Sequence, residues 1–512
     1  MSRKKRRAKL RNRERRIKYR LRERIWEPQE QPMFTASNIH FEISDRVRAL
    51  GPGGIGAVHL LSRRVGLIDA IDRDLHLLKI HRPYHESDHV LNIAYNLLCG
   101  GERLEHIELR RNDEVYLDAL GAQRIPDPTT EGDFCRRFEE THVEGLMDTI
   151  NEVRLGVWRQ QPDCFFDRAI IDGDGTMAPT TGECKQGMDI SYNGQWGYHP
   201  LVVSLANTGE PLYLVNRSGN RPSHEGAAQR YDQSIELCQR AGFRDILLRG
   251  DTDFSQTQHL DRWDEAGARF VFGIAAMENL EKIAEDLQKK QWGRLVRPPK
   301  YEVRTEPRER PANVKEQIVR HREYKNTRLV SEDVAEFDYR PVACRKTYRV
   351  VVVRKNLSVE QGQQALIPDI RYFFYITNIR TEPSAEIVFL ANNRCNQENL
   401  IAQLKTGVKA LSMPVDNMVS NWAYMVMASL AWTLKAWLAL LLPETGRWAQ
   451  KYQSEKLTVL RMEFRTFLNS FIQVPCQIVR TGRRIVYRLL SWNVWQHVFL
   501  RAIDALRRPL KC

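Results

Sequence analysis

Apolar residues recur at helical spacing through much of residues 31–160. The segment SDHVLNIAYNLLCGGERLEHIELRR begins with Ser and Asp, which are typical of a helix start, and continues with apolar residues three or four positions apart. The segment TTEGDFCRRFEETHVEGLMDTINEVRLGVW has the same pattern. Its common apolar side consists of Phe134, Phe138, Leu146, Ile150 and Val153. This spacing predicts a helical region.

The period of the pattern changes near residue 165. FFDRAIIDGDGT reads as an apolar strand that ends in a carboxylate-rich turn, and GYHPLVVSLANTGEPLYLVNR reads as two strands joined by an Asn-Thr-Gly turn. SHEGAAQRYDQSIELCQRAGF has the spacing of a helix ended by Gly242, and two further strands are expected in DILLRGDTDF and RFVFGIA. Three strands, a helix, a strand, a helix and a strand are the order of an RNase H-like α/β core.

The pattern then breaks into strand-like pieces separated by charged loops. YEVRT, TYRVVVVRKN and RYFFYITNI lie between residues 276 and 380 and predict a β-rich insertion. From about residue 412 the chain is expected to be helical and rich in Trp. The apolar run WAYMVMASLAWTLKAWLALLLPE is long enough to be tested as a membrane span, but Lys435 interrupts it and Pro443 ends it. We therefore interpret it as a buried helix.

These patterns predict an α/β protein with an RNase H-like catalytic core, a β-rich insertion, and flanking N-terminal and C-terminal helical regions. The expected segments are a basic disordered or helical tail (1–30), a helical DNA-binding region (31–160), the first part of the core (161–275), the insertion (276–382), the second part of the core with a glutamate-bearing helix (383–445), and a C-terminal helical region (446–512).

The glutamate-bearing helix is expected in ANNRCNQENLIAQLKTG, residues 391–407. If this stretch forms one helix, successive residues turn by about 100°. Arg394, Glu398, Ile401 and Lys405 then share one narrow stripe, beside a packed face of Leu400, Leu404 and Val408. Glu398 can be a surface ion-pair partner of its neighbours, which is the commoner role of such a residue, or it can hold a ligand.

Carboxylates elsewhere in the chain favour the second role. Asp174 ends the first predicted strand and Asp251 ends the fourth, and these strands are neighbours in an RNase H-like sheet. A helix packed at that edge would bring Glu398 to the same point. Three adjacent acids repel one another unless cations are bound, and carboxylate oxygens suit Mg²⁺ or Mn²⁺. Asp172 is either a further ligand or an acid that lies behind Asp174.

Charge and cysteine content indicate which kind of partner the protein binds and in which cellular compartment it works. The net charge is +14, and residues 1–26 contain 14 Lys or Arg and 2 Glu, so this segment carries most of the excess. Nucleic acid is the expected partner; a membrane surface fits less well, because the segment has few apolar residues to insert. Nine irregularly spaced Cys without a C-x-x-C motif, and no secretory signal, predict reduced thiols in a cytoplasm and no zinc ribbon. The expected location is therefore the cytoplasm, in association with the nucleoid.

With these motifs in order, the chain resembles the DDE transposases of bacterial insertion sequences. It is most similar to the group with a Y-x2-R-x3-E-x6-K signature and a β-rich insertion before the glutamate. Arg394, Glu398 and Lys405 match R, E and K, whereas Ala391 stands at the tyrosine position. The D-x-T motif fits Asp174-Gly175-Thr176, and the R-x-D-S-G-F motif fits residues 249–254, with Thr and Asp in place of Ser and Gly. The resemblance runs from about residue 84 to near the C-terminus.

The resemblance implies an enzyme that hydrolyses DNA at element ends and transfers the freed 3′-hydroxyls into target DNA. Asp174, Asp251 and Glu398 would be the catalytic residues and would hold two Mg²⁺ or Mn²⁺ ions about 4 Å apart. Double-stranded DNA, from element ends and target, would be the partner, and synapsis implies a homodimer by analogy. Arg394 and Lys405 would hold phosphate.

Two further DNA contacts are expected, each with an alternative. Trp292 in KKQWGRLVRPPK would stack on an unpaired base, or it covers the core of the insertion. Arg136 and Arg137 would face DNA from a helix-turn-helix, or their helices are plain packing elements. For the whole chain, the alternatives are an RNase H-like nuclease without strand transfer and an inactive transposase derivative that binds DNA.

Overall fold

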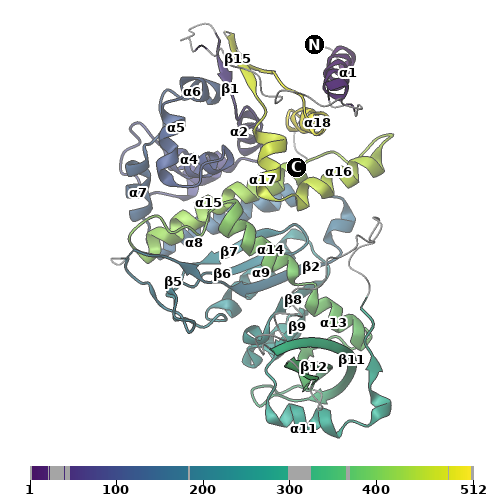
Figure 1. Ribbon diagram of the computed structural model, residues 1–512. Coiled ribbons are helices and arrows are strands. Elements are labelled where there is room, and N and C mark those ends of the chain that lie inside the picture. Colours follow the sequence, from purple (N-terminus) through teal and green to yellow (C-terminus); the bar gives the residue numbers. More distant parts are fainter. Residues whose placement is uncertain are drawn as a thin grey trace. The chain divides into compact units, whose positions relative to one another are not determined.

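The computed structural model describes residues 3–20, 22, 40, 47–182, 185–297, 325–361, 363–364, 369–481 and 484–508. The chain divides into two compact units (Figure 1). The first comprises Met1–Gln161, Gly182–Gln186 and Ala402–Cys512, and the second comprises Pro162–Thr181 and Gly187–Ile401. Each unit is described by itself below.

The second unit is built on a ten-stranded sheet. Its main path runs in the order β10-β11-β12-β14-β9-β8-β2-β6-β7, and β13 pairs with β12. The strands that residues 161–275 contribute to this sheet are β2 (Ala169–Gly175), β6 (Leu201–Leu205), β7 (Glu210–Val215), β8 (Ile246–Gly250) and β9 (Arg269–Ile274). The pairs β7–β6 and β6–β2 are antiparallel, whereas β2–β8 and β8–β9 are parallel. The predicted order of strands is therefore present, with the first and fourth predicted strands, β2 and β8, side by side.

The parallel pairs need crossover connections, and helices supply them. Helix α9 (Ala227–Ala241) joins β7 to β8, and α10 (Leu260–Glu265) joins β8 to β9. Gly242 ends α9 with a backbone φ of 95°, a left-handed conformation that glycine adopts without a steric penalty, so the helix end predicted at this residue is confirmed. Three short strands make a small separate sheet in the order β3-β5-β4: β3 (Ala178–Pro179), β4 (Asp189–Ile190) and β5 (Trp196–Tyr198).

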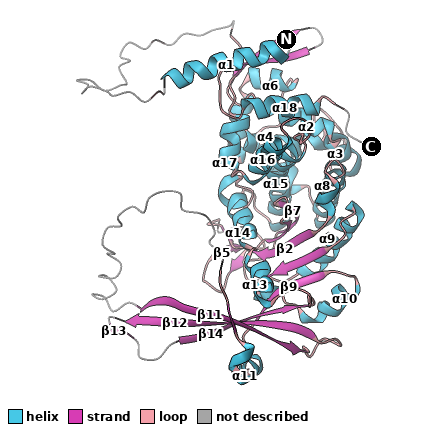
Figure 2. Ribbon diagram, turned by 90° about the vertical axis from the view of Figure 1, so that its right-hand side faces the viewer, coloured by secondary structure: helices cyan, strands magenta, loops and turns pink. Residues whose placement is uncertain are grey.

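The predicted insertion extends the same sheet instead of forming a separate one. Its strands are β10 (Gly293–Arg294), β11 (Lys325–Tyr339), β12 (Tyr348–Gln361), β13 (Gln363–Gln364) and β14 (Asp369–Thr377), preceded by helix α11 (Glu278–Asp286). β14 pairs with β9, and Figure 2 shows β11, β12 and β14 as long twisted ribbons. The strand expected in YEVRT lies outside the described residues.

Helices α13 (Ser384–Asn392) and α14 (Cys395–Ala402) follow the insertion strands. Ile387 and Val388 of α13 are buried in a core with Leu247 of β8, Val271 of β9 and Val351 of β12. One helix therefore packs on both the first strands of the sheet and the strands of the insertion. This packing fixes the direction in which the chain enters α14.

The first unit is mostly helical. Its N-terminal helices are α1 (Arg3–Arg20), α2 (Ile55–Arg64), α3 (Leu67–Asp74), α4 (Glu86–Leu98), α5 (Ile107–Arg111), α6 (Glu114–Leu120), α7 (Pro128–Arg136) and α8 (Glu140–Trp158). Its C-terminal helices are α15 (Met418–Leu440), α16 (Ala449–Arg461), α17 (Phe464–Phe467) and α18 (Gln496–Leu506). Asn417 caps α15 by accepting a hydrogen bond from the backbone N of Ser420 at 2.8 Å.

Helix α15 is the centre of this unit. It packs against α4, α7, α8 and α16. By length and composition it is the one described helix that could cross a membrane, but its apolar window is entirely buried within the protein. This burial agrees with the interpretation of the segment as a core helix.

The C-terminal region contains strands where the sequence pattern predicts only helices. β15 (Cys476–Thr481) and β16 (Arg484–Leu489) form a hairpin, and β1 (Ala49–Leu50) pairs with β15. The alternating apolar residues around Thr-Gly in this stretch are a hairpin signal that the helical pattern on either side obscures. The mixed α/β class with a large mixed sheet and many helices is confirmed.

Candidate active site

The alternation of Asp172, Gly173 and Asp174 along β2 sends the two carboxylates to one face of the sheet and the glycine to the other. A Cβ on Gly173 would lie 2.3 Å from the hydroxyl of Tyr231 on α9, so a larger residue would collide there. The α9 face is thus tightly filled. Both aspartates face the opposite side.

The segment Arg249-Gly250-Asp251 at the end of β8 repeats this arrangement. Arg249 is the register partner of Asp172 across the parallel pair, so their side chains share a face. A Cβ on Gly250 would lie 2.4 Å from the Cβ of Phe254, which explains the second glycine. Asp251 follows the strand, caps a short 3-10 turn, and accepts a hydrogen bond from the backbone N of Asp253 at 3.0 Å.

Arg249 joins three elements beneath the site. Its Nε and Nη2 donate to the two carboxylate oxygens of Asp172, each at 2.7 Å, and its Nη1 donates to the carbonyl oxygen of Leu390 on α13 at 2.9 Å. Asp172 is 1% exposed, and burial raises its pKa while Arg249 opposes that rise. Of the two roles considered for Asp172, the geometry favours the acid that lies behind Asp174. Arg249 matches the first position of the R-x-D-S-G-F motif, but its link to Asp172 and α13 is not predicted by the sequence.

The prediction of one continuous helix over residues 391–407 is wrong. Helix α13 ends at Asn392, a turn includes Arg394, α14 begins at Cys395, and a π-helical turn occupies Gln403–Gly407. Asn392 and Asn393 have side chains that compete for backbone hydrogen bonds, which favours a break. The single stripe from Arg394 to Lys405 therefore does not exist, although Leu400, Leu404 and Val408 are buried as expected.

The break turns Arg394 toward the two aspartates. Its Nη1 lies 3.5 Å from Oδ2 of Asp174, and its Nη2 lies 3.8 Å from Oδ2 of Asp251. Both distances exceed those of a good charge-assisted hydrogen bond. Nη1 is buried and has no hydrogen-bond partner among the residues that the structure describes. The guanidinium thus acts as a shared counter-charge for the two acids without being tightly bound to either.

The acids influence one another electrostatically. Burial raises the pKa of Asp174 to about 7; Arg394 opposes this rise, and the charges of Asp251 and Glu398 add to it. Burial also raises the pKa of Asp251, again against the effect of Arg394. Glu398 lies on α14 and is exposed. The structure therefore brings Asp174 and Asp251 together around one cation, with Glu398 near enough to act on Asp174.

A model of the family described as Transposase DDE domain group 1 matches residues 49–511. The chain belongs to this family. It is a DDE transposase, and such transposases are metal-dependent phosphoryl-transfer enzymes of DNA transposition. The family assignment covers both compact units.

Two other comparisons add little to this assignment. No curated protein matches the chain. Among solved structures, a cryo-EM structure of the piggyBac transposase synaptic complex with hairpin DNA is similar at 7% sequence identity and a TM-score of 0.35, with 90% of this chain and 87% of that chain covered.

Divalent metal ions are generally used by DDE transposases, and the residues at the strand ends have the right chemistry for them. Asp174 and Asp251 offer hard oxygen ligands, and a cation already lies between them in the form of Arg394. In the described part of the chain, however, no three His, Cys, Asp or Glu side chains are grouped closely enough to hold a metal ion as they stand. The residues fit a metal in type, but as they stand they are not grouped to hold one, and Arg394 lies between the two expected ligands.

Arg136 and Arg137 lie at the end of α7. Arg136 pairs with Asp133 at 2.9 Å and with Asp416 at 3.0 Å, and Arg137 is exposed. Helix α8, which would follow as a recognition helix, is buried along most of its length and packs against α3 and α15. This burial favours plain helical packing over a helix-turn-helix.

Trp292 and Lys405 are the other expected DNA contacts. Trp292 lies in the second unit, as do the two aspartates, whereas Lys405 lies in the first unit. Trp292 is half-buried; the guanidinium carbon of Arg354 lies 4.3 Å from its ring centroid, and the ring of Tyr372 lies at 6.4 Å. These contacts agree with a Trp that covers its own sheet. Lys405 lies in the π-helical turn of the first unit. The DNA contacts of both residues stay predictions.

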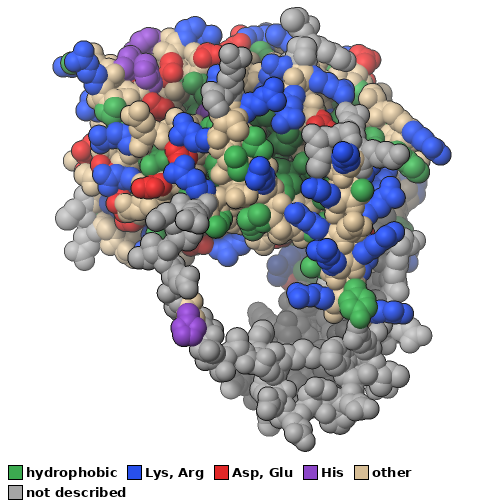
Figure 3. Space-filling view, turned by 90° about the horizontal axis from the view of Figure 1, so that it is seen from above, with side chains coloured by type: hydrophobic (Ala, Val, Ile, Leu, Met, Phe, Trp, Pro, Cys, Tyr) green, Lys and Arg blue, Asp and Glu red, His purple; other side chains and the backbone are tan. Residues whose placement is uncertain are grey.

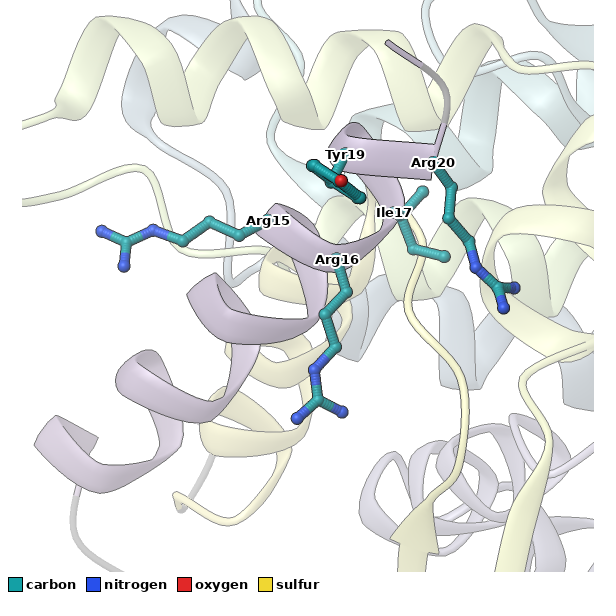
Figure 4. A pocket seen from close by; sticks show the side chains of 5 residues that line it. All are labelled: Arg15, Arg16, Ile17, Tyr19 and Arg20. Atoms are coloured by element: carbon teal, nitrogen blue, oxygen red, sulfur yellow. The ribbon is translucent and has the colours of Figure 1, made fainter.

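The basic N-terminal segment forms helix α1. Arg6 pairs with Asp504 of α18 at 2.6 Å, and Arg13 donates to the carbonyl oxygens of Leu489 and Ser491 at 3.0 and 3.1 Å. Figure 3 looks down on the face of the first unit that carries α1, where basic side chains gather. Figure 4 shows that Arg15, Arg16 and Arg20 point away from one another beside a shallow hollow at the end of the helix, which they line with Ile17 and Tyr19.

Proposed function

We propose that this transposase binds the ends of an insertion sequence, cleaves them by metal-dependent phosphodiester hydrolysis, and joins the 3′-hydroxyl ends to target DNA. The observation that carries the proposal is the meeting of Asp174 and Asp251 around one cation at the ends of adjacent parallel strands. An RNase H-like core is supported by the strand order β7-β6-β2-β8-β9, in which only the first two pairs are antiparallel.

Asp174, Asp251 and Glu398 would hold two Mg²⁺ or Mn²⁺ ions. When bound, such ions lower the pKa of an attacking water and neutralise charge on the scissile phosphate. The protein's own contribution is placement: β2 and β8 present the aspartates from one sheet edge, while the Arg249–Asp172 pair fixes the two strands to each other and to α13. Rigid placement matters because reacting groups must be held in close alignment.

Arg394 and Lys405 would hold the phosphate backbone near the reaction centre, as in the Y-R-E-K group of insertion-sequence transposases. Arg394 supports this role by lying beside the acids with one Nη group free of hydrogen bonds within the described chain. Double-stranded DNA would be the substrate, a homodimer would hold two ends, and the protein would act in the bacterial cytoplasm at the nucleoid. Trp292, Arg136 and Arg137 would be further DNA contacts, although the burial of α8 favours plain helical packing for the segment that carries the two arginines.

Substitution of the acids tests the catalytic part of the proposal. Glu398→Gln and Asp174→Asn keep the shape of the side chain and remove its charge, so Mg²⁺-dependent cleavage of end DNA should fall by at least a hundredfold. Binding of the same DNA in EDTA should change by less than threefold. Cleavage by Glu398→Gln at a rate near that of the wild type would leave Glu398 as an ordinary surface residue.

The products of the reaction test the remaining part. A transposase converts cleaved ends and a target plasmid into joined molecules, whereas a nuclease accumulates cleaved ends alone. Sequencing the joints would show whether the 3′ ends of the element are the strands transferred. Cleaved ends with no joined product, under conditions in which both DNAs are bound, would favour the nuclease.

A further inference from the structure

The side chain of Gln397 is buried directly beside the exposed Glu398. Gln397 is 1% exposed, whereas the next residue of α14 faces solvent. A buried carboxamide is costly unless it is hydrogen-bonded, and both of its polar atoms have partners. Its Oε1 accepts from the hydroxyl of Ser204, and its Nε2 donates to the carbonyl oxygen of Val202 at 2.9 Å.

Both partners of Gln397 lie opposite the aspartates. In the antiparallel pair β2–β6, Val202 is the register partner of Asp174, and Ser204 is the register partner of Asp172. Directly opposite residues of such a pair have Cβ atoms about 5 Å apart and on the same face. The amide therefore attaches α14 to the sheet one strand away from the active-site acids.

We propose that Gln397 is a positioning residue of the transposase: its two hydrogen bonds to β6 fix the rotation and register of α14, and so place Glu398 against Asp174. The proposal rests on the catalytic role of Glu398 given above. Because the side chain of Gln397 is 1% exposed and hydrogen-bonded to β6, its role would be exerted through Glu398.

The local structure explains why a directional link is needed here. Helix α14 has eight residues, follows the turn at Arg394, and runs into the π-helical turn Gln403–Gly407. Its other buried contacts come from Leu400 and Ile401, which are apolar and non-directional. A slip of one residue along a helix moves a side chain by about 1.5 Å and turns it by about 100°. A misplacement of that size can cost a hundredfold in rate.

The test replaces the amide by an apolar side chain of similar volume. In Gln397→Met, single-turnover cleavage of pre-bound end DNA in Mg²⁺ should fall ten- to a hundredfold, while the DNA dissociation constant stays within twofold. Ser204→Ala removes one of the two hydrogen bonds and should cause a smaller loss. The double variant should be no slower than Gln397→Met, because both changes break the same link.

Gln403→Met is the matched control for lost stability. The Oε1 of Gln403 accepts a hydrogen bond from the backbone N of Phe464 at 2.9 Å, so this variant also loses an amide hydrogen bond, but at a position without a link to β6. It should lower the unfolding temperature by a similar amount and leave the cleavage rate within twofold. The readout besides activity is Mn²⁺ binding followed by electron paramagnetic resonance, which should weaken at least threefold in Gln397→Met and stay unchanged in Gln403→Met.

The outcomes separate this inference from the proposed function. Normal cleavage by Gln397→Met, with Glu398→Gln inactive, overturns the positioning role and leaves the catalytic role intact. Active Glu398→Gln overturns the catalytic role itself. A rate loss in Gln397→Met that Gln403→Met reproduces would reduce Gln397 to a stabilising residue. If Gln397→Met does not fold, Ser204→Ala decides: a wild-type rate overturns the inference, and a several-fold loss with unchanged DNA binding supports it.

Discussion

At the scale of single residues, the site depends on alternation within two short motifs. Asp172 and Asp174 face one side of β2 because Gly173 lies between them, and Arg249 and Asp251 are related in the same way by Gly250. These glycines are needed for space, since a Cβ on either would meet an aromatic residue within 2.5 Å. The residue between each pair of polar side chains must therefore be glycine, because α9 and Phe254 fill the opposite face.

Gly173→Ala should test this packing. The added methyl group would lie 2.3 Å from the Tyr231 hydroxyl, which itself donates to the carbonyl oxygen of Arg249 at 2.9 Å. Overpacking of this kind costs roughly 1–3 kcal/mol, measured as a fall in the urea midpoint. The double variant with Tyr231→Phe should recover part of that loss. Gly145→Ala, in the open middle of α8, is the control and should be neutral or slightly stabilising; equal losses at both glycines would contradict the steric argument.

Arg394 provides the second prediction at this scale. Because its guanidinium lies between Asp174 and Asp251, it should oppose a divalent cation that seeks the same acids. A charge about 4 Å away is worth on the order of 1 kcal/mol even in water-like surroundings. Arg394→Gln should therefore bind Mn²⁺ roughly tenfold more tightly in calorimetric titrations without DNA. Its affinity for end DNA should fall in the same variant; unchanged Mn²⁺ affinity would mean that Arg394 acts on phosphate alone.

At the scale of elements, the sequence predicts whether a segment is a helix or a strand better than it predicts where one element ends and the next begins. The order of strands and helices from β2 to β9 follows from periodicity and turn residues, as does the helix end at Gly242. Asn392 and Asn393 are a local signal for the break at Arg394, but the helical spacing of apolar residues continues through it, and the acids that Arg394 faces lie more than 140 residues earlier in the chain. The pair of Arg249 with Asp172 and the attachment of Gln397 to β6 are likewise long-range contacts. Periodicity reports which face is apolar, but it does not report which polar side chains meet.

Lys435 provides a prediction about helix α15. It is 1% exposed, its Nζ lies 3.8 Å from the ring centroid of Trp432, and it donates to the carbonyl oxygen of Leu460 at 2.8 Å. Burial lowers its pKa from 10.5 to about 7. Between these two pH values the unfolded chain binds more protons at this lysine than the folded protein, so its contribution to stability rises with pH in that window. Below pH 7 the buried lysine is charged, and the full free-energy cost of burying that charge lowers the stability of the folded protein.

Lys435→Met removes this cost. The variant should be more stable than the wild type at pH 6, and the difference should shrink as the pH approaches 10. Each tenfold change in proton affinity is worth roughly 1.4 kcal/mol, so the change in this difference is at most about 5 kcal/mol. Urea midpoints at pH 6, 8 and 9.5, compared between variant and wild type, measure it. A difference that stays constant with pH would place the pKa of Lys435 near its ordinary value.

At the scale of the whole molecule, the family match spans residues 49–511 and leaves the basic N-terminus outside it. Residues 1–26 hold most of the net charge of +14. The most strongly charged part of the chain therefore lies outside the family match. In helix α1, Arg6 and Arg13 make contacts within the first unit. Arg15, Arg16 and Arg20 are exposed. The sequence predicts the charge of this segment and its tendency toward a helix. It does not predict the attachment to Asp504, because that contact joins residues almost 500 positions apart.

Deleting residues 1–26 should show whether α1 is a sequence-independent DNA anchor. Each phosphate that a Lys or Arg neutralises on duplex DNA steepens the fall of log K with log salt by about 0.9, so the deletion should flatten that slope by several units. Specific and random DNA should weaken alike, because phosphate contacts carry no sequence information. A variant with Arg15, Arg16 and Arg20 changed to Gln should flatten the slope by about 2–3 units and keep Arg6 and Arg13 attached. Titration of all three proteins with end and random duplexes at several salt concentrations measures both effects. An unchanged slope would mean that α1 does not contact DNA, whereas a collapse of the ratio between end and random DNA would mean that it reads bases.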